Sequence, residues 1–463
     1  MSFFKNILNN LPEVKGPTQK KVSFKEKLKW TLIVLSLFFI LGMIPLFGLG
    51  ENALQQFEYL SLILGAEFGS LISLGIGPIV TASIVLQLLN GSGLIKFDLT
   101  SHEGKKTFQG IQKLLAFFFI IFEACIFVFM GGLAPTSSLI GTASYMPLQI
   151  ALIFQLALGG VMIMFMDEVI SKWGFGSGIS LFIASGVSKN LFIRMFSPMA
   201  SPTNPNIATG AIPALFQALT MGDRITAGLM LGGLIATILV FVMAVYGQAM
   251  KIEIPLSFGR IRGHSIRWPL NFLYTSNIPV ILVAALMANV QLWARLLQNW
   301  GHPILGTFSG NTPISGLVSW LYSPNLLGSA IKGSLTGSQI LHSGVYLLFM
   351  MGGAVVFSWF WMQTSGMDAK SQAKQIMASG LQIPGFRKDQ RVLEKLLNRY
   401  IIPLTVMGAL TVGFLAGLAD ITGALSRGTG ILLTVMIIYK LYEEIAQQHM
   451  MDMNPMMRKF IET

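Results

Sequence analysis

Two stretches of the chain, GSGISLFI at residues 176–183 and GTGILLTV at residues 428–435, are nearly the same octapeptide. Each begins with Gly-x-Gly and continues into an apolar run that carries aliphatic side chains at similar positions. They lie in opposite halves of the 463 residues, too far apart for a short tandem repeat. The chain therefore begins two distant helices in the same way, and the fold has to explain why.

The composition places the chain among the membrane proteins. Hydrophobic residues make up 53% of it and charged residues only 11%, whereas a soluble domain carries about 25% charged residues. A formal net charge of +12 would suggest nucleic-acid binding in a soluble protein, but the long apolar runs decide the class first. The single cysteine, Cys125, excludes an internal disulfide bond.

Ten segments are predicted to cross the bilayer as helices, each of which needs about 20 apolar residues. The clear ones lie near residues 30–49, 71–94, 110–132, 146–166, 226–250, 272–294, 338–361 and 401–419. The two weaker ones, near 176–195 and 428–447, are those that begin with the octapeptides. Lys189 interrupts the first, and Arg427 and Lys440 crowd the second. Since such helices are better tolerated among other helices than against lipid, we expect both at the centre of the bundle.

The distribution of basic residues predicts the orientation. Ten crossings put both termini on one side, and the side richer in lysine and arginine faces the cytoplasm. With the N-terminus cytoplasmic, that side receives all of the 32 lysine and arginine residues except Lys189, Arg194, Arg224, Arg295, Lys332 and Arg427.

The order of the spans predicts an inverted repeat. The octapeptides open the fifth and the tenth span, so the two helices run in opposite directions. A second pair, SLGIGPIVTASI at 73–84 and TSNIPVILVAAL at 275–286, opens the second and the seventh span. Two pairs that are each five spans apart indicate two five-helix halves of inverted topology around a central pathway.

These spans divide the chain into five parts. Residues 1–28 form a cytoplasmic segment, residues 29–195 the first half, residues 196–225 an external loop, residues 226–448 the second half, and residues 449–463 a cytoplasmic tail. The first part is expected to begin as an amphipathic surface helix, because five apolar side chains share one helical face: Phe3, Phe4, Ile7, Leu8 and Leu11.

One segment between the first two spans is too short to cross. Residues 51–68 carry a helical apolar pattern formed by Leu54, Phe57, Leu60, Ile63 and Leu64. Non-spanning backbone at membrane depth survives only where protein or a water-filled cavity surrounds it. The pattern predicts a re-entrant plug helix, and the alternative is a loop on the outer surface.

No catalytic constellation is recognisable in the sequence. It contains no His-Glu-x-x-His, no Gly-Lys-Ser/Thr phosphate loop and no cluster of Cys and His. Glu123 is the clearest charge inside a span, whereas a solute transporter would be expected to show several converging polar groups. The repeated helix entrances instead offer aliphatic side chains, which are consistent either with an apolar constriction or with ordinary packing.

The sequence resembles the SecY family, the central subunit of the protein-conducting channel, and most closely its archaeal branch. The resemblance covers nearly the whole chain. It rests on the segments LGIGPIVTASIVLQLL, MDEVISKWGFGSGISLFIASGVS, EIPLSFGRIRG, SNIPVILVAALMANVQLW, GFRKDQRVLEKLLNRYIIPLTVM and GTGILLTVMIIYKLYEE. It implies an all-α membrane protein with ten helices in two inverted halves around a pore that is closed by a re-entrant plug.

The resemblance also implies two sites. A pore ring would consist of Ile76, Val80, Ile179, Ile183, Ile281 and Leu433. A lateral gate between spans 2–3 and 7–8 would have a polar cluster of Thr81, Glu123 and Asn289, in which Asn289 bonds to the other two across the gate. The alternative is that these polar groups only satisfy one another within the bundle. Lys189 departs from the family, in which an uncharged polar residue is more usual.

The implied partners are a ribosome, signal sequences and nascent polypeptides, membrane lipid, and SecE-like and small beta or SecG-like subunits that complete a heterotrimer. Ribosome docking would fall on the basic cytoplasmic loops 251–270 and 368–400, through Arg260, Arg262, Arg267, Arg387, Lys388 and Arg391. No cofactor and no catalysis are expected, and the expected location is the cell membrane with both termini in the cytoplasm. The rival interpretations are an inverted-repeat transporter of a small solute and a structural membrane scaffold.

Overall fold

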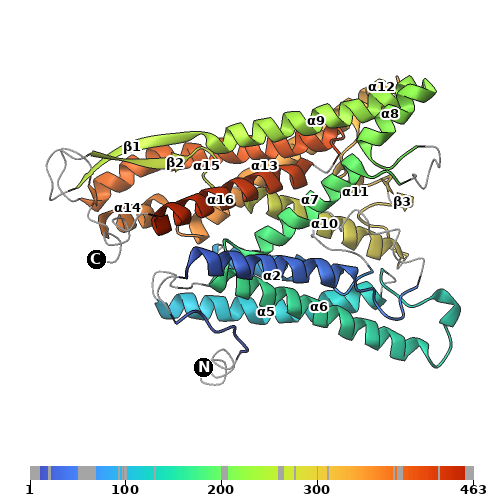
Figure 1. Cartoon of the computed structure of the whole chain (residues 1–463), viewed down its shortest axis with the longest axis horizontal. Coiled ribbons are helices and arrows are strands. Elements are labelled where there is room, and N and C mark those ends of the chain that lie inside the picture. Colours follow the sequence, from blue (N-terminus) through green and yellow to red (C-terminus); the bar gives the residue numbers. More distant parts are fainter. Residues whose placement is uncertain are drawn as a thin grey trace.

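The structure is a computed structural model. It describes residues 11–18, 22–50, 69–91, 94–95, 97, 102–129, 132–199, 207–258, 265–275, 278–299, 301–309, 312–378, 381–382, 389–425 and 428–453. Within these residues the chain is mostly helical, and most of its long helices run roughly along the long axis of the molecule (Figure 1). The mainly helical class expected from the sequence is confirmed.

A helix lies in each of the ten expected spans. The first five are α2 (Phe24–Met43), α4 (Gly77–Gly91), α5 (His102–Phe129), α6 (Tyr145–Trp173) and α7 (Gly178–Phe196). The second five are α9 (Arg224–Ala249), α10 (Ile278–Asn299), α13 (Gly337–Thr364), α15 (Gln390–Ile421) and α16 (Gly428–Met453). Among the described residues, seven of these helices are long and apolar enough to cross a membrane, namely α5, α6, α7, α9, α10, α13 and α15.

The helices form two groups that meet along the middle of the molecule. Helices α2, α5 and α6 lie together in the lower part of Figure 1, and α9, α13, α15 and α16 lie in the upper part. Within the groups, α5 packs on α4 and α6, and α13 packs on α10 and α15. Between the groups, α7 and α2 contact α16, and α4 contacts α10 and α13.

Two glycines allow the close contact between α13 and α15. Gly413 and Gly417 are four residues apart on α15, the spacing with which membrane helices bring their backbones together. A Cβ atom on Gly413 would lie 2.9 Å from the Cα of Met351, and one on Gly417 would lie 2.7 Å from Cδ1 of Leu347. Since a neighbouring backbone cannot give way as a side chain can, Gly413 is the more restrictive of the two positions.

The expected cytoplasmic loop 251–270 contains a β-hairpin that the sequence analysis missed. Strands β1 (Lys251–Phe258) and β2 (Ser265–Asn271) pair antiparallel, with Ile254 opposite Trp268. The short strand β5 (Leu381–Gln382) joins β1, so the two expected basic loops share one sheet. The signal was present in KIEIPLSF, where apolar residues alternate with polar ones and proline, as in a half-buried strand.

The second expected basic loop, 368–400, also contains regular structure in its described residues. It contains α14 (Ala369–Ala378), and α15 begins at residue 390, earlier than the expected 401, because the Asp389 side chain accepts a hydrogen bond from the Arg391 amide at 2.9 Å. Buried Ile254 and Leu270 of the hairpin pack with Leu393 and Leu397 of α15, so hairpin, α14 and α15 form one platform.

The remaining short elements connect the long helices. They are η2 (Ser137–Leu139), α8 (Ala211–Met221), strands β3 (Phe308–Ser309) and β4 (Thr312–Pro313), α11 (Leu317–Trp320) and α12 (Leu326–Ile331). Helix α8 lies in the expected external loop 196–225, where no helix was predicted. Residues 11–18 contain no helix, so Leu11 is not helical, and the other four apolar residues of the predicted surface helix lie outside the described residues.

We predict that Gly413→Leu destabilises the protein by about 1–3 kcal/mol, because the added side chain forces α15 away from the α13 backbone. The measurement is the thermal unfolding midpoint of the purified protein in detergent. The control is Gly352→Leu on α13, where a Cβ atom meets nothing within 4 Å. Equal midpoints for the two variants would contradict the close packing of α13 on α15.

Candidate functional site

The two octapeptide helices pack against each other at the centre of the molecule, in opposite directions. At the end of α7, the Arg194 guanidinium donates a hydrogen bond of 3.2 Å to the carbonyl of Leu425, just before α16 begins. Just before α7 begins, a Cβ atom on Gly176 would lie 3.6 Å from Oε2 of Glu444, in the later half of α16. The two helices thus run antiparallel, as the inverted repeat requires.

Backbone conformation and close packing explain why both Gly positions of the first octapeptide carry no side chain. Gly176 has φ +68°, a backbone conformation that residues with a side chain rarely adopt. A Cβ atom on Gly178 would lie 2.6 Å from the Cα of Asp167 in α6. This closeness lets the Asp167 carboxylate accept a hydrogen bond of 2.9 Å from the Ile179 amide, whereas the N-cap residue of α7, Ser177, makes no side-chain cap. A carboxylate from the neighbouring helix therefore caps α7.

The structure brings the six side chains of the predicted pore ring into one apolar cluster. Three of them are buried, with exposed fractions of 2% for Ile76, 2% for Ile183 and 6% for Leu433, and the three partly buried ones packed against that cluster are Val80, Ile179 and Ile281. They come from α4 and the turn before it, α7, α10 and α16, so both halves contribute. We call these six side chains the apolar ring.

Helix α16 contributes side chains to both hydrophobic cores. Leu433, Ile437 and Leu441, at intervals of four residues, pack in the core of the first half. Ile431 and Val435 pack instead with α9, α10, α13 and α15 in the core of the second half. Because α16 is apolar on both faces, it connects the halves through the same turn of helix that carries Leu433.

The predicted gate residues lie where α4 and α5 face α10 and α13, which we call the seam. The Thr81 hydroxyl is 2.9 Å from the Gly77 carbonyl and 3.4 Å from Oε1 of Glu123. The hydroxyl has a single proton, so it can donate a hydrogen bond to only one of these two oxygens at a time. Ala288 of α10 packs with Ala124 of α5 in one buried cluster, so the helices meet at the depth of Glu123.

The expected bond across the seam is absent from the structure. Among the described residues, no hydrogen bond joins the half-buried Asn289 to Thr81 or to Glu123. The polar contacts of this region lie instead within the first half. Besides Thr81 and Glu123, the Gln112 amide of α5 donates to the Ser83 hydroxyl of α4 at 2.7 Å. Helices α4 and α5 are therefore tied to each other, while Ala288 of α10 belongs to the same apolar cluster as Ala124 of α5.

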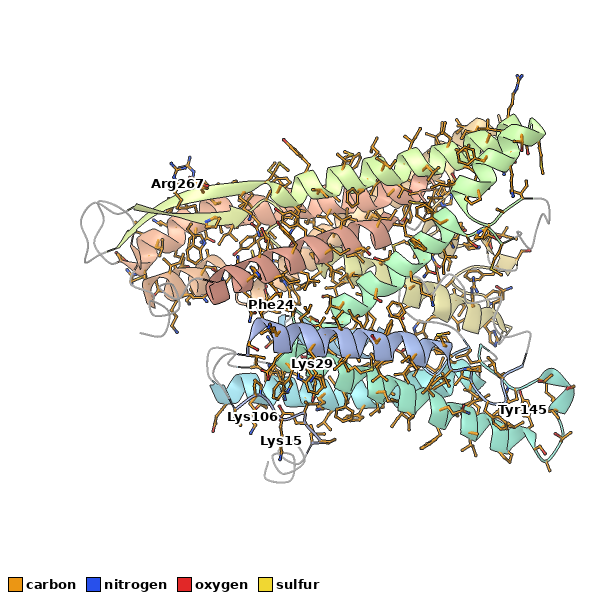
Figure 2. All side chains as sticks on the ribbon, viewed as in Figure 1. Lys15, Phe24, Lys29, Lys106, Tyr145 and Arg267 are labelled. Carbon is orange, nitrogen blue, oxygen red and sulfur yellow. The ribbon has the colours of Figure 1, made fainter. Side chains whose placement is uncertain are left out.

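Four basic side chains, Lys15, Lys29, Lys106 and Arg267, lie on the side of the molecule that carries the hairpin, whereas Tyr145 lies at the opposite end (Figure 2). The beginning and the end of the described chain also meet there, since Lys27 donates to the Gln448 side chain at 2.9 Å and the Gln448 amide donates to the Val22 carbonyl at 3.0 Å.

Of the predicted docking residues, two are described. Arg267 forms an exposed ion pair of 2.9 Å with Glu253 across the hairpin, and Arg391 is exposed in the first turn of α15. Lys395 and Arg399 follow it at intervals of four residues and are exposed as well, so they extend one basic stripe along α15. The others, Arg260, Arg262, Arg387 and Lys388, lie outside the described residues.

The predicted plug, with Leu54, Phe57, Leu60, Ile63 and Leu64, also lies outside the described residues. Within the described part of the chain, no three His, Cys, Asp or Glu side chains are grouped so that they could hold a metal ion. The sequence analysis did not single out Asp167 as a cap, although an acid eleven residues before a Gly-rich helix start offered a weak signal.

Comparisons with known proteins agree with this geometry. The sequence model of the SecY family matches residues 70–442. The protein translocase subunit SecY of Methanothermobacter thermautotrophicus is 45% identical over 462 residues, which cover 99% of this chain and 98% of the relative. A structure described as that of a protein conducting channel has a TM-score of 0.80 and 42% identity, and covers 96% of this chain and 97% of its own. Sec61 in the canine ribosome-channel complex has a TM-score of 0.77, with the same identity and coverage.

We predict that Asp167→Ala destabilises the protein by about 0.5–2 kcal/mol, because the first turn of α7 loses the acceptor for its Ile179 amide. Asp167→Asn retains an oxygen at that place and should recover most of the loss. Thermal unfolding of the parent and both variants in detergent is the measurement. If alanine and asparagine destabilise equally, the hydrogen bond to the helix start is not what Asp167 contributes.

Proposed function

This chain belongs to the SecY family of protein translocase subunits, and we propose that its apolar ring is the constriction through which unfolded polypeptide crosses the membrane. It is a multi-pass membrane protein and the pore-forming subunit of a translocase. The observation that carries the assignment of the ring is that six aliphatic side chains from both halves meet in one cluster.

An apolar constriction suits the task for two reasons. A translocating polypeptide presents every kind of side chain, so hydrogen-bonding groups at the waist would hold some sequences and stall them. Contacts between aliphatic side chains are non-directional, and they can part and close again around any of these sequences. In the resting state, the same side chains exclude ions because an apolar constriction does not stay wet.

The seam is proposed as the lateral gate, through which apolar segments leave toward lipid. Apart from the Thr81–Glu123 contact within the first half, its closure would depend on apolar packing, as in the cluster that contains Ala288 and Ala124. An apolar signal helix can replace such contacts with equivalent ones, so the seam can open without leaving new polar groups exposed to lipid.

The cytoplasmic end is proposed to be the one that carries the hairpin and the basic stripe, in the cell membrane, with both termini on that side. The ordered platform of hairpin, α14 and α15 would dock a ribosome, whose RNA phosphates attract Arg267 and Arg391 together with Arg260, Arg262, Arg387 and Lys388. The solved canine relative, which is a ribosome-channel complex by its description, supports this assignment.

Two further assignments complete the proposal. Residues 51–68 are proposed as the plug that lies against the ring from the outside, and single-span SecE-like and small beta or SecG-like subunits as the partners that complete a heterotrimer. No catalytic step is assigned to this chain. The transporter alternative is disfavoured because the described waist offers aliphatic side chains and no converging polar groups.

We predict that Ile179→Asn combined with Ile281→Asn makes the resting channel leak ions. Each buried amide without a partner costs about 1–3 kcal/mol in the closed waist. Every 1.4 kcal/mol is a tenfold change in an equilibrium, so conductance should rise at least about tenfold. The measurement is the ion current of the purified translocase in planar bilayers.

The matched control is Ile179→Val combined with Ile281→Val, which keeps both side chains apolar and should stay tight. Tight recordings from the asparagine variant, obtained with protein that still exports a strong signal sequence, would remove these two side chains from the waist.

We predict that Thr81→Val lowers the signal hydrophobicity needed for export, because Glu123 loses its hydroxyl partner in the closed seam. Hydrogen bonds between membrane helices average about 0.6 kcal/mol and reach about 1.7 kcal/mol, so export of a marginal signal should rise about 3- to 18-fold. The assay is export of a graded series of signal helices with decreasing leucine content. Thr411→Val is the control, since that exposed hydroxyl bonds only its own helix. The same threshold in both variants would exclude Thr81 from the gate.

A further inference from the structure

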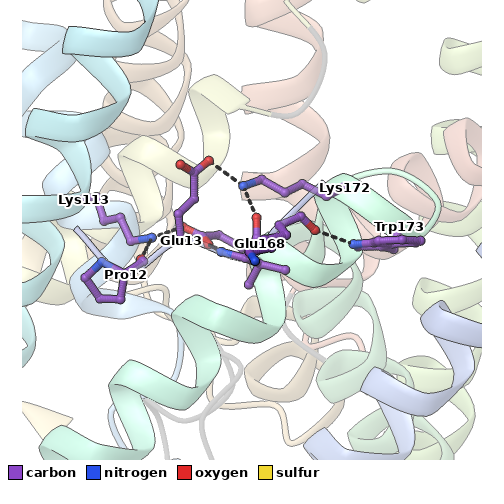
Figure 3. A network of polar contacts seen from close by, with 8 residues as sticks. Pro12, Glu13, Lys113, Glu168, Lys172 and Trp173 are labelled. Carbon is purple, nitrogen blue, oxygen red and sulfur yellow. Dashed lines mark hydrogen bonds and ion pairs between the residues drawn. The ribbon is translucent and has the colours of Figure 1, made fainter. Parts of the chain in front are cut away.

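A short extended segment near the N-terminus is bound by the ends of α5 and α6. Residues 12–15, which we call the strap, lie across Lys113 of α5 and Glu168, Lys172 and Trp173 of α6 (Figure 3). The Lys113 ammonium donates to the Pro12 carbonyl at 2.5 Å, and the Val14 amide donates to Oε2 of Glu168 at 3.0 Å. Two helices are thus bound to one piece of main chain.

Further contacts extend along the strap. Lys172 donates to the Val14 carbonyl at 2.6 Å and to Oε1 of Glu13 at 2.5 Å, and the Trp173 indole donates to the Lys15 carbonyl at 2.9 Å. The bond to Lys172 lowers the pKa of the Glu13 carboxyl, so the Glu13 side chain stays charged at neutral pH. Four of the contacts described here reach backbone atoms, which any sequence would supply.

The ion pair beneath the strap is well shielded from solvent. Lys113 and Glu168 bond to each other directly, and their side chains are only 11% and 19% exposed. The Lys113 ammonium also lies 5.3 Å from the ring centre of Phe165. Because the pair is partly desolvated and each partner also holds the strap, separating α5 from α6 at this end would leave several polar groups without partners.

Lys113 connects this pair to the seam. It follows Gln112, which bonds α5 to α4 through Ser83, and it lies ten residues before Glu123 on one unbroken helix, about 15 Å away. Helix α6 packs in turn on α2 and α7, in the central part of the first half. The α4–α5 pair is therefore held to the centre at its cytoplasmic end.

From this arrangement we infer that the strap sets how readily the seam opens, by restraining the α4–α5 pair against α6. The inference rests on the proposed function of the seam as a lateral gate. An intact strap makes the pair move together with α6 and α2, and a released strap lets it move alone. The strap and the Lys113–Glu168 pair are then positioning elements that fix the signal stringency of translocation without touching the polypeptide.

The test uses the complete translocase in proteoliposomes and the graded series of signal helices. Deletion of residues 2–15 and, separately, Lys113→Gln should each raise export of a marginal signal at least about tenfold, the change expected from losing one partly buried charged contact. Both changes act on the same restraint. The deletion leaves the direct Lys113–Glu168 contact in place, so the deletion combined with Lys113→Gln should exceed either single effect but stay below the product of the two.

Three variants separate this role from a general loss of stability. Lys113→Arg keeps the charge and should stay close to the parent. Lys15→Gln removes one exposed charge of the strap but none of its carbonyl contacts, and should also match the parent. Thr411→Val again controls for a change in an exposed part of the bundle.

The outcomes are distinct. An unchanged threshold after deletion and after Lys113→Gln overturns the inference, as do two effects that simply multiply. A parent translocase that exports not even the strongest signal would contradict the proposed function itself. A parent that exports strong signals with a threshold that these changes do not move would contradict only the role of the strap.

Discussion

The antiparallel packing of α7 against α16 is the contact on which the rest of the structure depends. It brings Ile183 and Leu433, near the inner ends of the two octapeptides, into one cluster, and it gives α16 a buried face toward each half. The ring follows from this arrangement, because Ile179, Ile183 and Leu433 reach the centre only if the two helices run side by side in opposite directions. The seam follows as well, since this contact holds the halves together on one side and α4 is free to meet α10 and α13 on another.

Polar groups inside this bundle are mostly satisfied within one helix or one half. Thr237 and Thr405 donate to carbonyls four residues earlier in their own helices, as Thr81 does to Gly77. Hydrocarbon offers no partner for a hydroxyl, so this local bonding leaves the helices free to separate without a large polar cost. The Lys113–Glu168 pair beneath the strap also lies within the first half, but it joins two helices through opposite charges at one end of the molecule.

The sequence predicted the centre of the molecule better than its periphery. The octapeptides and the SLGIGP and SNIP segments identified the inverted pairs, because glycine and proline at helix starts leave a pattern that is independent of distant contacts. The hairpin was missed although Ile252, Ile254 and Leu256 alternate with polar residues and proline, because the basic residues of this segment favoured a loop. The strap could not be predicted, because Val14 meets Glu168 through its backbone, which leaves no trace in side-chain type. The bond of Asn289 across the seam was expected from the resemblance alone, and the structure does not form it.

The length of α15 has a consequence for the mechanics of the molecule. Its 32 residues span about 48 Å, about 18 Å more than the hydrocarbon layer, and its projecting turns carry the hairpin and α14 as a rigid extension. In the described part of the chain, α15 continues that extension directly into the second half. If a large partner binds this extension, the second half is held in place with it. A widening of the seam then moves the lighter first half through the surrounding lipid.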